Sequence, residues 1–352
     1  MDESFVTPLI DWYKKSRRDL PWRRQNSAYE IWISEIMLQQ TRVAAVIPYY
    51  GRFLSAFPTP AALADADDTL LMKLWEGLGY YSRARNLKRA ARAIVERFGG
   101  ELPRDYGALL TLPGIGDYTA GAIASIAYRI PVPAVDGNVV RVLLRMRNST
   151  DDAAEPGTKA KLRSELLAML GDEASPAHAD AGTFNAAMME LGATVCVPNG
   201  APHCDVCPVR AFCEAGKAGT AERLPIRSKK APRRIEEKTV FVLRLPDGRL
   251  LGGKRDGTGL LASLYRLVEA EGILDEPDMA KRLTAWGLHP TGELMVFARK
   301  HVFTHIEWHM RVAACDVAAP GALPDGMIPL ETGYALPTAY RICIPKEFTE
   351  EV

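Results

Sequence analysis

The chain has 352 residues, enough for two domains that each bury a core, and its 47% hydrophobic and 25% charged residues are ordinary for a globular protein. The formal net charge of +1 excludes a polycation, so nucleic-acid binding must come from local basic clusters. No apolar run has the length of a membrane span, and the opening residues, MDESFVTPLIDWYKK, lack the apolar stretch of a signal peptide. We therefore expect a cytoplasmic protein that does not enter a membrane.

Residues 1–222 are predicted to be helical. Apolar residues recur at the spacing of a helix in six segments: Tyr29–Tyr50, Leu70–Trp75, Leu87–Phe98, Thr119–Tyr128, Val139–Met146 and Phe184–Val195. Proline and glycine separate these segments, as expected for turns between helices. One further stretch, Arg83–Arg97, holds six basic residues and one acidic residue. These basic side chains either bind DNA phosphates along one helix face or form an ordinary solvent-exposed face.

The character of the chain changes near residue 223. Arg223–Lys238 carries seven basic and two acidic residues, which predicts an exposed linker. After it, the apolar residues alternate with the period of strands. We predict two strands around an Asp247-Gly248 turn, a later strand and one helix, at Thr239–Leu245, Leu250–Leu251, Val302–Val317 and Asp278–Trp286 respectively. Residues 239–352 therefore form a predicted α/β domain.

Four of the six cysteines fall within 18 residues, in the pattern C-x7-C-x2-C-x5-C formed by Cys196, Cys204, Cys207 and Cys213. In a cytosolic protein such crowding favours a metal site over disulfides. Four thiolates at this spacing are able to enclose a cubane iron–sulfur cluster or one zinc ion. Four buried thiols without a metal are the third interpretation.

A Pro-Gly turn, Leu112–Gly116 (LPGIG), lies between two predicted helices. Such a turn presents backbone N–H groups at the start of a helix, where they can hold a DNA phosphate without contacting bases. Taken alone, the turn is also an ordinary helix connection. Twenty residues later comes Asp136, in Val135–Val139 (VDGNV), which is suited to cap a helix as well as to act chemically.

LPGIG, VDGNV and the cysteine pattern, in this order, resemble the helix-hairpin-helix family of base-excision DNA glycosylases. SEIMLQQT (Ser34–Thr41), GLGYYSRARN (Gly77–Asn86) and FTH (Phe303–His305) are similar to the adenine DNA glycosylases of the MutY type within that family. The resemblance covers nearly the whole chain. It implies an all-α helix-hairpin-helix glycosylase domain with an iron–sulfur cluster over 1–222, a linker over 223–238, and an α/β nudix-like recognition domain over 239–352.

The resemblance also implies an activity. It predicts a monofunctional glycosylase, active as a monomer on double-stranded DNA, that flips out adenine mispaired with 8-oxoguanine or guanine and cuts its N-glycosidic bond. One [4Fe-4S] cluster on the four cysteines is the implied cofactor. The second domain lacks the acidic, metal-binding box of nudix hydrolases, so we expect it to recognise the lesion and not to hydrolyse nucleotides.

Breaking an N-glycosidic bond requires a proton on the leaving base and stabilisation of an oxocarbenium-like sugar, and two carboxyl groups can divide this work. The resemblance implies that Glu35 is the general acid for adenine N7 and that Asp136 lies near the sugar. Apolar neighbours on a helix, Ile31, Trp32 and Leu38, should raise the pKa of Glu35. Tyr118 and Asn138 match supporting hydrogen-bond groups.

Tyr118 also distinguishes two activities. In the endonuclease III type, the matching position carries a lysine that forms a Schiff base, which a tyrosine is unable to form. We therefore expect base removal without efficient strand cleavage.

The remaining matches concern binding. The adenine pocket is expected at Trp22, Arg23, Leu38, Val43 and Glu190. DNA contacts are expected from the wedge residues Gln40 and Tyr80 and from the hairpin glycines Gly114 and Gly116. Lesion recognition is expected at Phe303, Thr304 and His305, where Thr304 replaces a serine and keeps the hydroxyl.

Two other functions remain open at this point. One is a glycosylase/lyase of the endonuclease III type acting on oxidised pyrimidines, which Tyr118 and the second domain disfavour. The other is a non-enzymatic iron–sulfur DNA-binding protein, which the pair Glu35 and Asp136 disfavours.

Overall fold

The computed structural model describes residues 3–24, 27–228, 231–318 and 321–348. The chain divides into two compact units, one of residues 1–66 and 85–229 and the other of residues 67–84 and 230–352. The stretch 67–84, which the sequence-based division left in the first domain, thus groups with the second unit. Residues 229 and 230 of the predicted linker lie outside the described residues.

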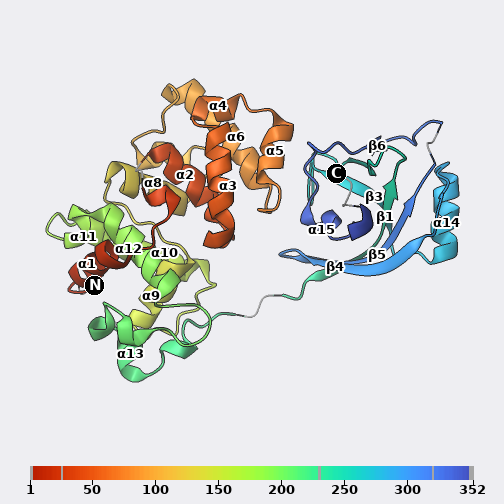
Figure 1. Ribbon diagram of the computed structural model, residues 1–352. Coiled ribbons are helices and arrows are strands. Elements are labelled where there is room, and N and C mark those ends of the chain that lie inside the picture. Colours follow the sequence, from red (N-terminus) through yellow and green to blue (C-terminus); the bar gives the residue numbers. More distant parts are fainter. Residues whose placement is uncertain (1–2, 25–26, 229–230, 319–320, 349–352) are drawn as a thin grey trace. The chain divides into compact units, whose positions relative to one another are not determined.

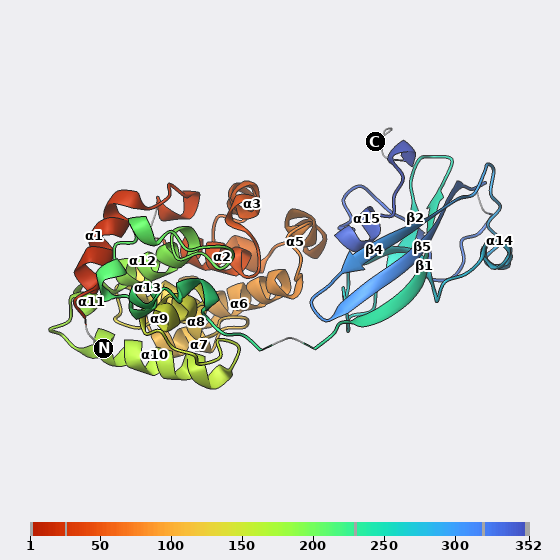
Figure 2. The ribbon, with the colours of Figure 1, turned by 90° about the horizontal axis from the view of Figure 1, so that it is seen from below.

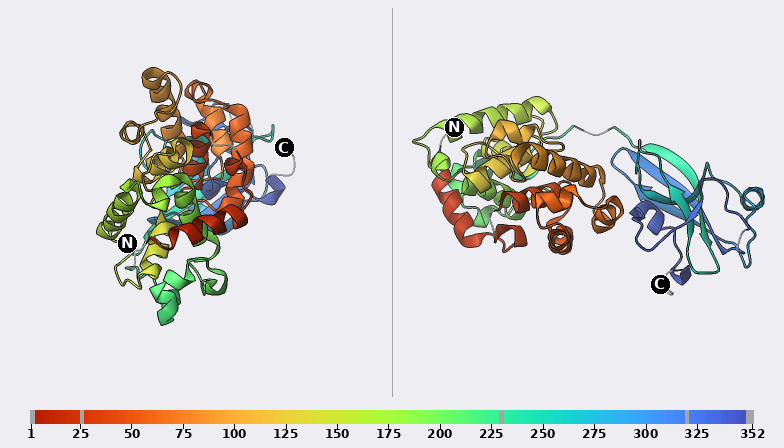
Figure 3. Two further views of the ribbon diagram at one scale, coloured as in Figure 1. Left: turned by 90° about the vertical axis from the view of Figure 1, so that its left-hand side faces the viewer. Right: turned by 90° about the horizontal axis from the view of Figure 1, so that it is seen from above.

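Every regular element described in the first unit is a helix (Figure 1). The helix α10 lies on the outside of this unit (Figure 3). Among the described residues, no helix is both long and apolar enough to cross a bilayer. The helices are α1 Val6–Ser16, η1 Pro21–Arg23, α2 Ala28–Leu38, α3 Val43–Ala56, α4 Pro60–Ala64, α6 Ser82–Phe98 (whose first three residues belong to the second unit), α7 Tyr106–Leu110, α8 Asp117–Tyr128, α9 Gly137–Met146, α10 Pro156–Gly171, α11 Pro176–Ala179, α12 Ala181–Thr194, η2 Cys204–Val206, η3 Arg210–Phe212, α13 Glu214–Ala218 and η4 Ala221–Arg223.

The helix α12 is central to this unit, because it packs against α1, α8 and α9, while α2 packs against α8. Two close approaches in this unit require glycine. A Cβ on Gly121 of α8 would lie 2.3 Å from the carbonyl oxygen of Pro133, and one on Gly192 of α12 would lie 2.6 Å from Cβ of Asn138. These close approaches hold the segment before α9, and the start of α9 itself, against α8 and α12.

The predicted helical segment Tyr29–Tyr50 is two helices and not one. Residues Gln39–Arg42 separate α2 from α3, and Gln40 has a φ of +56°. A right-handed helix excludes positive φ, so the helix must end before Gln40. The apolar residues keep their helical spacing across this turn, and the spacing therefore does not mark it.

Among its described residues, the second unit forms a six-stranded mixed sheet in the order β4-β5-β1-β3-β2-β6. Its strands β1 and β5 pair in parallel, and the other paired strands are antiparallel. Successive residues of β1 face opposite sides: Val240 and Val242 pack with Tyr340 of α15, whereas Phe241 packs with Met279 of α14. The sheet therefore carries a helix on each face (Figure 2). The elements are α5 Asp68–Trp75, β1 Arg234–Arg244, β2 Leu251–Lys254, β3 Tyr265–Glu271, α14 Glu276–Ala285, β4 Met295–Val302, β5 Ile306–Asp316, β6 Ile328–Pro329, α15 Thr338–Arg341 and η5 Lys346–Phe348.

The predicted linker extends too far. Arg234–Lys238, predicted as the end of the linker, begins β1 and pairs with Ile306–Met310 of β5, a distant segment that the local charge pattern does not reveal. The two predicted strands around Asp247-Gly248 are confirmed, because β1 ends at Arg244, β2 begins at Leu251, and a bridge joins Arg244 to Leu250 across the turn. Within the sheet, β3 lies between β1 and β2. The predicted helix near Asp278–Trp286 is confirmed as α14.

Gly121→Ala tests the contact between α8 and the segment before α9. Because the added Cβ meets a backbone oxygen that cannot rotate away, we expect the free energy of unfolding to fall by about 1–3 kcal/mol despite the better helix propensity of alanine. Gly171→Ala, also helical but with open space around it, is the control and should be neutral or up to about 1 kcal/mol stabilising. Equal effects in urea titrations of the two variants would contradict the close contact.

Candidate active site

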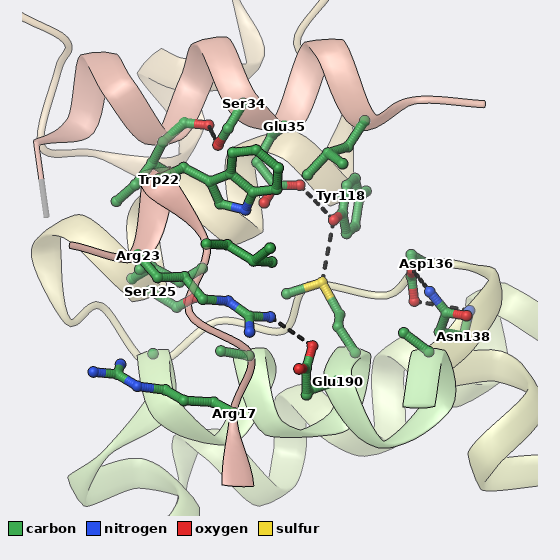
Figure 4. A pocket seen from close by; sticks show the side chains of 18 of the residues that line it. Arg17, Trp22, Arg23, Ser34, Glu35, Tyr118, Ser125, Asp136, Asn138 and Glu190 are labelled. Carbon is green, nitrogen blue, oxygen red and sulfur yellow. Dashed lines mark hydrogen bonds and ion pairs between the residues drawn. The ribbon is translucent and has the colours of Figure 1, made fainter. Parts of the chain in front are cut away.

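An open pocket of about 1270 Å³ lies in the helical unit. Its walls come from η1, α2, α8, α9 and α12, together with the loops beside them. Figure 4 shows the polar side chains of these elements pointing into one space. Ten residues singled out from the sequence line it: Trp22, Arg23, Glu35, Leu38, Gln40, Val43, Tyr118, Asp136, Asn138 and Glu190.

Glu35 lies on α2 with 7% of its surface exposed. The Tyr118 hydroxyl, from α8, donates a hydrogen bond to Oε2 of Glu35 at 2.5 Å. Burial raises the pKa of Glu35 to about 7, because it outweighs the hydrogen bond from Tyr118 and the attraction of Arg23, and the nearby Asp136 raises it further. A carboxyl group that titrates near neutrality is able to deliver a proton at physiological pH.

Asp136 caps α9 and faces the pocket as well. Its Oδ1 accepts hydrogen bonds from the backbone N–H groups of Asn138 (2.9 Å) and Val139 (2.8 Å), and its Oδ2 accepts one from Nδ2 of Asn138 at 2.7 Å. Burial raises the pKa of Asp136, although these hydrogen bonds oppose the shift. The helix cap fixes where the carboxylate stands, so the capping and chemical interpretations are compatible.

Asn138 is itself held from behind. Arg141, 4% exposed, donates to Oδ1 of Asn138 at 2.8 Å and to the carbonyl oxygens of Gly192 (2.7 Å) and Cys196 (2.8 Å). The amide of Asn138 therefore has a fixed orientation, with its nitrogen toward Asp136.

Glu190, 1% exposed, is held by two arginines. Arg18 donates to both of its oxygens, at 2.8 and 2.7 Å, and also through its backbone N–H at 3.0 Å, while Arg23 donates to Oε2 at 2.7 Å. Burial alone would raise the pKa of Glu190, but these hydrogen bonds lower it to about 2. Because four donors occupy its two oxygens, Glu190 accepts from an adenine amine only if one of these contacts gives way.

Arg18 was not singled out from the sequence. It lies in a basic run, RRDLPWRR, whose members look alike, and its partner Glu190 is 172 residues away. Met189 was missed too, since a methionine on a helix is ordinarily a core residue; here its sulfur lies 3.1 Å from the Tyr118 hydroxyl.

The two predicted wedge residues share an unusual backbone. Gln40 (φ +56°) and Tyr80 (φ +46°) are both in the left-handed region, and both are exposed. Non-glycine residues are uncommon there, and such strain, about 1–3 kcal/mol per residue, persists mostly at functional positions.

In the predicted hairpin, Gly114 has a φ of +78° and packs against Asn86, where a Cβ would approach Cβ of Asn86 to 2.8 Å. Gly116 caps α8 and has open space around it. Two basic residues of α6 make hydrogen bonds within the fold: Lys88 and Arg92 donate to the carbonyl oxygens of Ala66 and Ala64, respectively. The basic face of α6 is therefore partly structural.

In the second unit, Phe303–His305 form the turn between β4 and β5. The ring of Phe303 packs edge-on against Trp308 at 4.9 Å between centroids, whereas Thr304 and His305 are exposed. Tyr80, which belongs to this unit, places its hydroxyl 2.6 Å from Oγ1 of Thr304. A predicted wedge residue and a predicted lesion-recognition residue are thus in contact.

The four clustered cysteines line one small apolar pocket beside α9 and α12. All four are free thiols. Arg145, 2% exposed, donates to Sγ of Cys196 at 3.2 Å, and the N–H of Gly216 donates to Sγ of Cys213 at 3.3 Å. Free thiols that share a cavity and accept N–H bonds have the donor set of an iron–sulfur or zinc site.

A helical fold, a pocket that Glu35 and Asp136 both face, and a helix-hairpin-helix turn define a DNA base-excision protein of the helix-hairpin-helix class. Accordingly, the family model "HhH-GPD superfamily base excision DNA repair protein" matches residues 33–167. The structure of a thermostable thymine-DNA glycosylase is similar with a TM-score of 0.54 and 27% identity, over 61% of this chain and 95% of that one. An endonuclease III trapped on DNA, at 24% identity and a TM-score of 0.51, shares the fold.

Among curated proteins, the chain is 42% identical to an adenine DNA glycosylase of Mycolicibacterium smegmatis, over 67% of this chain and 79% of that protein. It is 47% identical to that of Rattus norvegicus and 46% to that of Homo sapiens, over 60% and 63% of this chain. The chain belongs to the adenine DNA glycosylase family, as the sequence resemblance predicted. It spans 42% and 41% of the length of the rat and human relatives.

Glu190→Gln tests the ion pairs with Arg18 and Arg23. The folded-state pKa of about 2 lies below the ordinary 4.5, so the ionised group stabilises the fold above pH 4.5, and this contribution is lost as pH falls toward 2. We expect a loss of about 3 kcal/mol at pH 7, measured by chemical denaturation, that shrinks below pH 4.5. Asp19→Asn, which breaks an exposed pair with Arg24, is the control and should change nothing measurable. A loss independent of pH would contradict the ion-pair assignment.

Proposed function

We propose that this protein is a monofunctional glycosylase that removes adenine mispaired with 8-oxoguanine, or with guanine, from double-stranded DNA. The observation that carries the proposal is Glu35, a buried carboxyl group with a near-neutral pKa, in one pocket with the capped carboxylate of Asp136. Membership of the adenine DNA glycosylase family supports the choice of base.

In the proposed reaction, Glu35 gives its proton to N7 of the flipped adenine. The C1′–N9 bond then breaks, its electron pair leaves with the base, and the sugar becomes an oxocarbenium ion. Asp136 stabilises this cation, while the Tyr118 hydroxyl donates to the new carboxylate of Glu35. Water adds to C1′ and its proton passes to the carboxylate of Glu35, which regenerates the protonated acid and leaves Asp136 ionised.

Strand cleavage is not part of the proposal, because the side chain nearest to Glu35 on α8 is a phenol and not an amine. Among the described residues that line the pocket, the one lysine is Lys159, an exposed residue on α10. Lys159 lies on another helix than Tyr118, which occupies the hairpin position on α8 where a lyase would carry its amine.

We further propose that the wedge residues Gln40 and Tyr80 enter the base stack, that the hairpin at Gly114 and Gly116 holds a phosphate, and that Phe303, Thr304 and His305 read the opposite base. The strained, exposed backbone of the first two supports this, as do the exposed Thr304 hydroxyl and the open space at Gly116. In the pocket, Trp22, Leu38 and Val43 would pack against adenine beside Arg23 and Glu190.

The four cysteines are proposed to hold one [4Fe-4S] cluster. The small apolar cavity and the N–H donors to two sulfurs fit such a group. When bound, the cluster would supply a covalent cross-link between the end of α12 and the loop that follows.

We also propose that the protein acts as a monomer in the cytoplasm, on DNA.

A duplex assay tests the function. Under single-turnover conditions we expect adenine release from A:8-oxoguanine, slower release from A:G, and none from A:T, with strand breaks only after hot alkali. Glu35→Gln should reduce release by at least about 1,000-fold while retaining duplex binding, because the amide keeps the size of the side chain but lacks the proton. Release of oxidised pyrimidines in place of adenine, or near-normal release by Glu35→Gln, would overturn the proposal.

Metal analysis tests the cofactor. Protein prepared without oxygen should hold about four iron atoms per chain, with broad absorption at the edge of the visible range. Cys207→Ser should lower the iron content, whereas Cys315→Ser, at a buried thiol in the second unit, should not. Stoichiometric zinc without iron would refute the cluster.

A further inference from the structure

The hydroxyl of Tyr118 lies between two hydrogen-bond acceptors. Its oxygen is 2.5 Å from Oε2 of Glu35 and 3.1 Å from Sδ of Met189, and both contacts are dashed in Figure 4. A phenol carries one hydrogen and therefore donates to one acceptor at a time. A thioether sulfur is a weak hydrogen-bond acceptor and has no hydrogen to donate, so Met189 can interact with the hydroxyl only as an acceptor.

The placement of this sulfur sets Met189 apart from its neighbour on α12. Met188 is 1% exposed and packs in the core with residues of α1, α9 and α10. Met189 is half-buried and lines the pocket. Leucine would fill the same apolar space, so the acceptor is the property that methionine adds.

The direction of the hydrogen follows from the protonation state of Glu35. When Glu35 is ionised, its carboxylate is the stronger acceptor and takes the hydrogen from Tyr118. When Glu35 is protonated, its own O–H can donate to the phenol oxygen, and the phenol hydrogen then needs another acceptor. The sulfur of Met189 is within reach of it.

We propose that Met189 is a positioning residue for the general acid, whose sulfur accepts the Tyr118 hydrogen while Glu35 is protonated and gives it up once Glu35 has protonated the base. The proposal rests on the proposed glycosylase function. The exchange moves hydrogen bonds only, since the proton of Glu35 goes to adenine N7 and the phenol keeps its own hydrogen.

Three other groups face Glu35 from the elements around it: Tyr118 on α8, Asp136 before α9 and Arg23 in η1. Arg23 is engaged by Glu190, and Asp136 is fixed as the cap of α9. None of these contacts involves Met189, so replacing its sulfur leaves their charges in place. The raised pKa of Glu35 agrees with an environment that favours the protonated acid.

Met189→Leu keeps the volume and removes the acceptor. Single-turnover adenine release on A:8-oxoguanine duplex, measured from pH 5.5 to 9, should keep its low-pH plateau within about twofold. The fall in rate at higher pH should move down by about half to one pH unit, the size of one modest hydrogen bond, so that release at pH 8 is about three- to tenfold slower. Met188→Leu should leave the profile unchanged, and Met189→Ile, a second side chain without an acceptor, should repeat the shift.

A double-mutant cycle separates this effect from packing. In a Tyr118→Phe background no hydroxyl is present, so adding Met189→Leu should no longer shift the profile. An unshifted profile for both Met189→Leu and Met189→Ile, an equal loss at every pH, or the same shift in the Tyr118→Phe background would overturn the proposal. Failure of the unmodified protein to release adenine at all would instead refute the proposed function.

Discussion

The burial of Glu35 beside the Tyr118 hydroxyl is the constraint on which the helical unit depends. A carboxyl group taken out of water needs a partner, and here the partner comes from another helix, 83 residues away. The two helices must therefore touch, and α8 is suited to close contact because a run of small residues, Ala120, Gly121, Ala122 and Ala124, is buried along it. The same run lets the segment before α9 approach, which brings the cap residue Asp136 to the pocket.

Three carboxyl groups of one pocket acquire three different characters from their surroundings. Glu35 meets one neutral donor, so burial dominates and its pKa rises. Asp136 meets three donors of its own turn, which oppose the effect of burial without cancelling it. Glu190 meets two guanidinium groups and stays ionised far below neutral pH. The protonation state of each carboxyl group thus depends on the hydrogen-bond donors that the surrounding helices place beside it.

The sequence predicts α8, α9 and α12 well, because each holds many apolar residues over the length of a helix. It fails at Gln39–Arg42, where the chain reverses without a glycine or proline to mark the turn. It also fails at the start of β1, where Arg234–Lys238 pair with Ile306–Met310 much later in the chain. Ten residues that were chosen by their resemblance to family motifs line one pocket. Arg18 and Met189 could not be chosen in this way, because their partners lie 172 and 71 residues away in the sequence. The roles of these site residues stay predictions.

The left-handed backbone at Gln40 and Tyr80 places two demands in conflict. The main chain at each position favours glycine or asparagine, whereas a residue that is to enter a base stack must be large. A glutamine and a tyrosine stand there all the same, which agrees with the wedge role proposed for them. Conflict of this kind, in which a residue suits its neighbours poorly and yet is retained, is a mark of frustration in the folded chain. Of the six described non-glycine residues with positive φ, two are the positions that the family motifs single out for intercalation.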